Sequence, residues 1–226
     1  MKTTNTPLWA FLPIGLGIFI IGFLAGNITS TCEANECENL QANVIEATES
    51  KTESEAGTYY YLGEEDAPIT MTEYTDYQCT FCQRYFFNTF SQIRDAFIAT
   101  GKVRYTVKDL ALSFHPKSRP AVYAARCAGE QNEYWEMHEK IFTYQNQWAY
   151  ADNTDEVFSQ YASDLGLDMP KFETCYKSGP AKFDKQIEAD ILEASKQGIS
   201  GTPSFSINGE IIIGAQPFES FSSLIK

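Results

Sequence analysis

Two cysteines separated by two residues, Cys79 and Cys82, constrain this chain more than any other feature. They follow an apolar, β-prone run over residues 69–75, and an aromatic-rich helical pattern begins at the first of them. A helix start carries a partial positive charge and free N–H groups, which stabilise a thiolate on Cys79 and lower its pKa. We therefore interpret the pair as a candidate redox centre that closes into a disulfide and opens again.

A Cys-x-x-Cys pair is also half of a zinc site. A complete site would need a second such pair or a matching pair of histidines, and the only histidines in the chain are His115 and His138. They do not form such a pair, so we expect no metal and no cofactor. We expect both histidines to be structural rather than catalytic.

The charge of the chain restricts its partners. The 226 residues include 30 acidic and 17 basic side chains, for a formal net charge of −13. This balance argues against nucleic acid and against an anionic lipid surface, both of which attract basic patches. Solubility of an exported protein explains the acidic excess more simply than an acidic partner-binding face does. The length suits one domain and a short extra segment.

The cysteine content and the N-terminus both indicate a location outside the cytoplasm. Six cysteines are many for a cytosolic protein of this size. Residues 8–28 are almost wholly apolar, about the length of a membrane span. Lys2 is the only charged residue before Cys32, which predicts that the rest of the chain lies outside. We expect residues 1–28 to be an uncleaved transmembrane signal anchor, with a cleaved signal peptide as the alternative.

Residues 29–57 are rich in polar side chains and predict a flexible acidic linker. The linker contains Cys32 and Cys37, close enough to form a small local disulfide without catalytic function. A relay to a membrane partner and an intermolecular link are the alternatives.

The rest of the chain alternates between strand and helix patterns. A strand at 69–75 is followed by a helix from about Cys79 to Gly101 and a second strand at 103–112. Asn208-Gly209 lies between two short alternating runs and is a strong hairpin signal. The predicted helices cover residues 119–130, 133–145, 154–165, 168–177, 180–197 and 218–225. The order predicts a small α/β unit interrupted by a helical insertion at about 118–198.

Two further residues are candidates for the same site. Pro203, preceded by Thr202 at the start of a predicted strand, is either a cis-proline beside the cysteine pair or an ordinary trans turn proline. Glu73, six residues before Cys79, either points into the core beneath the pair or faces solvent. A buried carboxylate there would have a raised pKa and could exchange a proton with Cys82.

Five separated motifs resemble the DsbA-like thioredoxin-fold family and occur in its order, over roughly Tyr59 to the C-terminus. They are the residues 76–82 around the cysteine pair, Phe-His-Pro at 114–116, and the segments 124–131, 134–142 and 198–205. The resemblance implies a thioredoxin fold with a helical insertion over residues 58–226.

The resemblance also implies roles for individual residues. Cys79 matches the exposed nucleophile and Cys82 the resolving cysteine, while Glu73 matches the buried acid and Pro203 the cis-proline. Thr202, Thr80 and Phe81 are the expected substrate-contacting neighbours. Well-known oxidases of the family have a proline and a histidine between the cysteines, whereas Thr80 and Phe81 stand here.

The expected function is disulfide formation in exported thiol-containing proteins, outside the cytoplasm. The family implies a quinone-linked membrane oxidase of the DsbB or vitamin K epoxide reductase type as the recycling partner. The missing motif histidine and Thr202 favour the alternative of a disulfide reductase or isomerase. A non-catalytic binding module is a further alternative.

Cys127 and Cys175 lie in the helical block, 48 residues apart. We expect a structural disulfide that joins two helices, and buried free thiols are the alternative.

Overall fold

The computed structural model describes residues 50–54 and 57–225, and within these residues six strands form one mixed sheet in the order β1-β2-β4-β3-β5-β6. The central strand β3 pairs in parallel with β4 and antiparallel with β5. The strands are β1 Ser50–Ser54, β2 Gly57–Leu62, β3 Ile69–Thr75, β4 Val103–Asp109, β5 Ser204–Ile207 and β6 Glu210–Ile213. The β5–β6 hairpin turns at the predicted Asn208-Gly209 pair, with both residues in the left-handed region at φ 47° and 91°.

The crossover from β3 to β4 is a helix that contains two π-helical turns. Its parts are α2 Thr80–Tyr85, the π-helical turn η1 Phe86–Phe90, α3 Ser91–Ile93 and the π-helical turn η2 Arg94–Ile98. The spacing of the apolar residues predicts one regular helix whose buried face carries Cys82, Phe86, Phe90, Ile93 and Phe97. A π-turn adds a residue and rotates the face that follows it. Cys82, Phe90, Ile93 and Phe97 are buried as predicted, whereas Phe86, the first residue of η1, is only partly buried.

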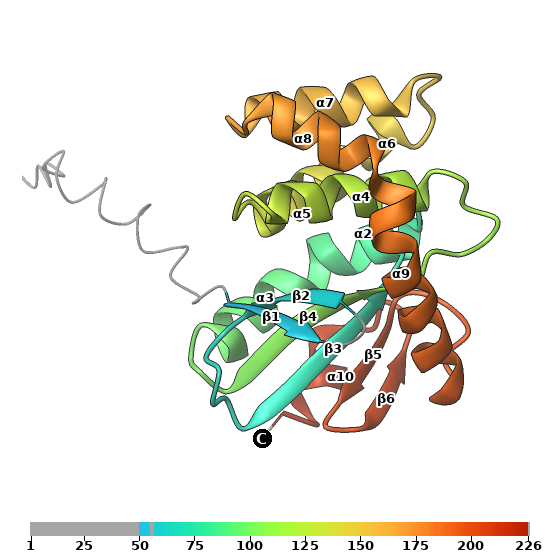
Figure 1. Cartoon of the computed structure of the whole chain (residues 1–226). Coiled ribbons are helices and arrows are strands. Elements are labelled where there is room, and N and C mark those ends of the chain that lie inside the picture. Colours follow the sequence, from blue (N-terminus) through green and yellow to red (C-terminus); the bar gives the residue numbers. More distant parts are fainter. Residues whose placement is uncertain (1–49, 55–56, 226) are drawn as a thin grey trace, which may run out of the picture. The chain divides into compact units, whose positions relative to one another are not determined.

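The helical insertion lies between β4 and β5, as predicted. Figure 1 shows α4, α5, α7 and α8 gathered on one side of the sheet, while α9 runs back from them to the sheet. The Asp168 side chain accepts from Lys171 N at 3.1 Å and caps α8. The helices are α4 Ser118–Gly129, α5 Tyr134–Thr143, α6 Gln145–Trp148, α7 Thr154–Asp164, α8 Met169–Lys177 and α9 Gly179–Lys196, and α10 Phe218–Ser222 follows the hairpin.

A buried charged cluster joins the insertion to the sheet. Arg126 of α4 is 3% exposed and pairs with Asp109 at the end of β4. Its Nη1 also donates to the Thr58 carbonyl of β2 at 2.9 Å. Asp190 of α9 accepts from the Asp109 backbone N–H at 3.1 Å and from the Tyr59 hydroxyl at 2.6 Å. Because these groups are hydrogen-bonded to one another, the two parts are fixed together without leaving a buried charge unpaired.

The C-terminal end of the expected linker over residues 29–57 forms a strand in the structure. Residues 50–54 form the edge strand β1, which pairs antiparallel with β2 from Ser50 opposite Tyr61 to Ser54 opposite Gly57. An edge strand needs only one neighbour for its backbone, so a polar sequence does not prevent it from forming. The ordered sheet therefore begins before residue 58.

The expected anchor at residues 1–28 and the pair Cys32 and Cys37 lie outside the described residues. Within residues 50–54 and 57–225, no helix combines the length and the apolar character needed to cross a bilayer.

Candidate active site

The Cys79–Cys82 pair lies where β3 passes into α2. Cys79 is the residue directly before the helix, with an extended backbone (φ −76°, ψ 122°), and Cys82 lies in the first turn. Cys79 is 7% exposed and Cys82 is fully buried. They are the free cysteines among the described residues. The pair is therefore in its dithiol form, and only Cys79 is accessible from outside.

The two thiols differ strongly in acidity. The pKa of Cys79 is lowered to about 6, first by the hydrogen bond from the Cys82 thiol and further by Thr202 and by the backbone N–H groups of Phe81 and Cys82. Burial opposes this shift. Burial raises the pKa of Cys82 well above its usual value, and the neighbouring Cys79 raises it further. At pH 7 Cys79 is mostly a thiolate and Cys82 is a thiol.

Glu73 lies in the core beneath the pair rather than in solvent. It belongs to the central strand β3, opposite Val107 on one side and Phe205 on the other, and is 2% exposed. The Tyr105 hydroxyl donates to Glu73 Oε2, and Oε1 has no hydrogen-bond partner among the described residues. Burial raises the pKa of Glu73 to about 7. The carboxyl group can therefore hold or release a proton near neutral pH.

The segment before β5 meets the cysteine pair from the other side. The Thr202–Pro203 peptide bond is cis. Cys79 Sγ lies 3.5 Å from the Thr202 carbonyl oxygen, to which it donates when it is protonated. The structure thus brings together Cys79, Cys82, Glu73, Thr202 and Pro203, which the sequence assigned to one site.

A cavity of about 480 Å³ opens beside Cys79. Three aromatic residues at its edge are strongly exposed, namely Phe81 at 54%, Phe114 at 72% and Tyr150 at 78%. Exposed aromatic groups of this kind are common where a protein binds a partner. The lining residues are Gln78, Cys79, Thr80, Phe81, Leu112, Phe114, His115, Gln145, Ala149, Tyr150, Ser200, Gly201 and Thr202.

Three residues that the sequence analysis did not assign to the site help to build it. Gln145 is buried and donates to the carbonyl oxygens of Tyr77 at 2.7 Å and Cys79 at 3.0 Å. Asp76 is buried and accepts from Gln78 N, while His115 Nδ1 lies 2.9 Å from Asp76 Oδ2. The Phe-His-Pro motif is the sequence signal that marks His115, whereas nothing local marks Gln145.

The other histidine has the structural role expected for it. His138 lies in α5, is 2% exposed, and its Nδ1 is 2.9 Å from the Tyr77 hydroxyl. Burial lowers the pKa of His138 to about 3, so its ring is neutral.

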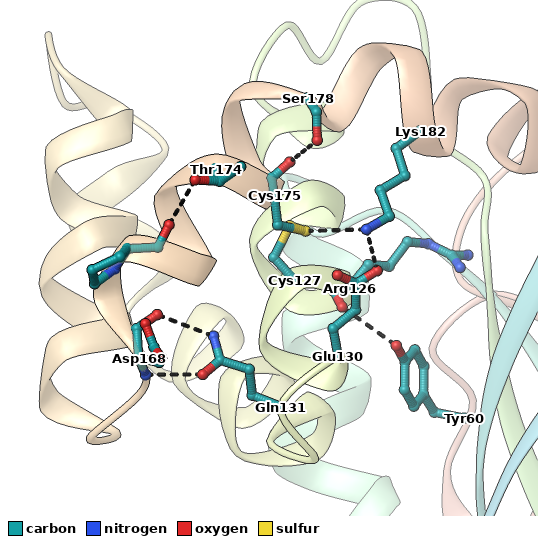
Figure 2. Close-up of a disulfide and its surroundings, with 11 residues drawn as sticks. Tyr60, Arg126, Cys127, Glu130, Gln131, Asp168, Thr174, Cys175, Ser178 and Lys182 are labelled. Atoms are coloured by element: carbon teal, nitrogen blue, oxygen red, sulfur yellow. Dashed lines mark hydrogen bonds and ion pairs between the residues drawn. A yellow bond between two sulfur atoms is a disulfide. The ribbon is translucent and has the colours of Figure 1, made fainter.

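Cys127 and Cys175 form a disulfide, with an S–S distance of 2.04 Å, rather than two free thiols. Figure 2 shows that it joins α4 to α8. Lys182 Nζ lies 3.9 Å from Cys175 Sγ and 2.5 Å from Glu130 Oε1. The bond joins two helices of the insertion. Cys175 lines a different cavity, which shares no residue with the cavity beside Cys79.

Comparison with known proteins places most of the chain in one family. A family model described as Thioredoxin matches residues 55–226. The Na(+)/H(+) antiporter NhaA 3 of Salinispora tropica is 30% identical over 164 residues, which is 72% of this chain and 24% of the antiporter. A Rickettsia conorii protein named for protein-disulfide oxidoreductase activity is 25% identical over 148 residues, which is 66% of this chain and 52% of that protein. The chain thus spans about a quarter and about half of these relatives.

Solved structures agree with the fold. Oxidised BdbD from Bacillus subtilis has a TM-score of 0.64 and 27% identity, covering 73% of this chain and 89% of that chain. The alpha-DsbA1 protein of Wolbachia pipientis has a TM-score of 0.65 and 25% identity, covering 73% of this chain and 87% of that chain. The helical insertion and the sheet therefore have counterparts in proteins of the DsbA type.

Proposed function

Since the chain belongs to the DsbA-like thioredoxin family of thiol–disulfide oxidoreductases, we propose that it forms disulfides in exported proteins outside the cytoplasm. The Cys79–Cys82 disulfide is the group donated to the substrate. One observation carries this proposal, namely the opposite acidities of the two thiols. A thiolate that is stabilised on Cys79 stabilises the reduced pair, and a stable reduced form makes a stronger oxidant.

The reaction proceeds by two exchanges at Cys79. A substrate thiolate attacks Cys79 Sγ, the bond to Cys82 breaks, and a mixed disulfide forms. A second substrate thiol displaces Cys79, which leaves as a thiolate, and the substrate is released as a disulfide. Glu73 exchanges the proton of Cys82, which a buried carboxyl with a pKa of about 7 supports.

The substrate binds in the cavity beside Cys79. Thr80, Phe81 and Thr202 line this cavity and are the proposed substrate contacts. Backbone groups next to Pro203 hold an extended substrate segment as an added strand. The exposed ring of Phe81 provides apolar contact area that tolerates varied sequences.

An oxidant of this kind must be reoxidised. We propose a quinone-linked membrane oxidase of the DsbB or vitamin K epoxide reductase type as the electron acceptor. A membrane anchor at residues 1–28, which lie outside the described part of the chain, would hold the domain near that partner and raise its effective concentration.

Reduction or isomerisation of disulfides is the second candidate. It is favoured by Thr80 and Phe81, which provide no histidine inside the motif, and by Thr202 before the proline. In this direction Cys79 attacks a substrate disulfide and Cys82 releases the reduced substrate.

The redox equilibrium of the full chain with glutathione separates the two candidates. Alkylation followed by peptide mass analysis distinguishes Cys79/Cys82 from the other cysteines. We expect a potential near about −120 mV, typical of strong oxidases. A value near about −270 mV, typical of thioredoxin, would contradict the oxidising direction and support a reductase.

A further inference from the structure

A histidine from a distant loop lines the cavity that opens beside Cys79, although the Cys-x-x-Cys motif itself contains no histidine. His115 belongs to the loop between β4 and α4, and it lines the same cavity as Cys79. Its side chain is 21% exposed. A thiol that enters this cavity to reach Cys79 therefore meets a wall to which His115 contributes.

Asp76 fixes which ring nitrogen of His115 is free. The buried Asp76 carboxylate accepts from the backbone N–H of Gln78 at Oδ1 and of Leu112 at Oδ2, both at 2.8 Å. His115 Nδ1 lies 2.9 Å from the same Oδ2. Because the carboxylate acts as an acceptor in these bonds, Nδ1 carries the hydrogen and donates it. In the neutral ring Nε2 is then a proton acceptor.

Among the described residues, the hydrogen bond of the His115 ring is the one between Nδ1 and Asp76, and Nε2 makes none. The arrangement has the three parts of an activated nucleophile site: a buried carboxylate, an imidazole that it orients, and a cavity that leads to a sulfur. The nucleophile in this case is the incoming substrate thiol.

We propose that His115 Nε2 accepts the proton of the substrate thiol as it attacks Cys79, and that Asp76 is the positioning residue. In this step the substrate S–H bond breaks and its proton moves to His115. A bond forms between the substrate sulfur and Cys79 Sγ, the Cys79–Cys82 bond breaks, and its electron pair remains on Cys82. In the reverse direction the same proton returns to the departing substrate thiolate.

The inference rests on the proposed attack at Cys79 but not on the direction of electron flow. A thiol with a pKa of about 8.5 is about 3% ionised at pH 7, so a proton acceptor can raise its rate by at most about 30-fold. A reagent that arrives as a thiolate needs no acceptor. The two kinds of reagent thus separate proton transfer from binding and folding.

The test is stopped-flow reduction of the oxidised full chain at pH 7 with 2-mercaptoethanol and, separately, with 4-mercaptophenylacetate, which is mostly a thiolate at that pH. We expect His115→Gln to slow the reaction with 2-mercaptoethanol by about 10-fold and to leave the rate with 4-mercaptophenylacetate within about twofold. Asp76→Asn disturbs the hydrogen bond from Nδ1. It should also slow the reaction with 2-mercaptoethanol relative to the reaction with the thiolate reagent, but by a smaller factor than His115→Gln.

Phe114→Ala is the matched control, because Phe114 precedes His115 on the same loop and lines the same cavity. We expect it to change both rates in the same proportion. The proposal is overturned if His115→Gln slows both reagents equally, which indicates a structural role, or slows neither. Failure of the Cys79 assignment is distinguishable, because peptide mass analysis of the trapped mixed disulfide would then place the reagent on Cys82 instead of Cys79.

Discussion

The two cysteine pairs in the described part of the chain lie at opposite ends of their helices. Cys79 directly precedes α2, whereas Cys127 and Cys175 lie in the last turns of α4 and α8. Free N–H groups and a partial positive charge favour a thiolate at a helix start, and carbonyl groups disfavour one at a helix end. The hydrogen bond from the Cys82 thiol lowers the pKa of Cys79 most, and the backbone N–H groups at the helix start add to it, whereas Cys127 and Cys175 are joined in a disulfide.

The two pairs also differ in the length of chain between their cysteines. Two residues separate Cys79 from Cys82, so closing that bond restricts the unfolded chain little. Cys127 and Cys175 are separated by 48 positions, and a crosslink over such a length removes much more freedom from the unfolded chain. One pair is suited to exchange and the other to stability.

The largest expected effect comes from the exchanging pair. Cys79→Ser should slow oxidation of a reduced two-cysteine peptide by at least about 1,000-fold, because the attacked sulfur is lost. The double variant Cys127→Ala/Cys175→Ala should keep the rate within about threefold under conditions where it is folded. Peptide oxidation followed by mass measures both. A folded double variant without oxidation activity would contradict the assignment of exchange to one pair and stability to the other.

The disulfide should dominate a stability measurement. We expect Cys127→Ala/Cys175→Ala to lower the free energy of unfolding by about 4 kcal/mol in the chain-entropy estimate for a 48-residue loop. Urea unfolding without reductant, followed by circular dichroism, measures the loss. Cys82→Ala is the comparison, measured against protein in which only the Cys79–Cys82 pair has been reduced, since it then removes a buried thiol but no crosslink. A loss below about 1 kcal/mol for the double variant would refute a stabilising role.

The sequence predicted the elements that have local signals. Asn208-Gly209 predicted the hairpin because its two residues adopt the left-handed conformation that the turn needs. Asp168 predicted the start of α8 because its side chain caps the helix. The two π-helical turns and the strand β1 were missed, since packing and a neighbouring strand determine them rather than the periodicity of their own residues.

The residues of the site could likewise be predicted where they belong to local motifs, but not where only distant contacts place them. Cys79, Cys82 and Pro203 belong to recognisable motifs, and the alternation of strand residues predicts that the side chain of Glu73 points inward. Gln145 was missed because its amide contacts the carbonyl oxygens of residues more than 60 positions away. Contacts of that kind depend on how the insertion docks on the sheet, and no local pattern records them.

The buried carboxyl beneath the exchanging pair should give the reduced protein a distinctive pH dependence. Glu73 keeps its proton up to a pKa of about 7 in the folded protein, against an ordinary glutamate value of 4.5. Its contribution to stability is therefore present below pH 4.5 and is lost as the pH rises through 7. Glu73→Gln removes this loss and should raise the free energy of unfolding at about pH 8.5 by up to about 3 kcal/mol, with little change at about pH 4.

Urea unfolding of the reduced protein at both pH values measures this effect. Glu139→Gln is the matched control, because it removes the same charge from an exposed position of α5 and should change stability by less than about 0.5 kcal/mol. Equal effects of Glu73→Gln at the acidic and the alkaline pH would contradict a carboxyl group that titrates near neutral pH.

The smallest expected effect concerns the one ammonium group drawn beside the stabilising disulfide in Figure 2. Lys182 Nζ is 3.9 Å from Cys175 Sγ and also pairs with Glu130. Negative charge spreads over the sulfur atoms during exchange, so Lys182→Gln should slow reduction of this disulfide by dithiothreitol about two- to threefold, as expected for one partly exposed charge. Glu130→Gln frees the ammonium and should accelerate the reduction slightly. Alkylation of Cys175 over time measures both rates, and a change of the same sign in the two variants would show that Lys182 acts through packing rather than through its charge.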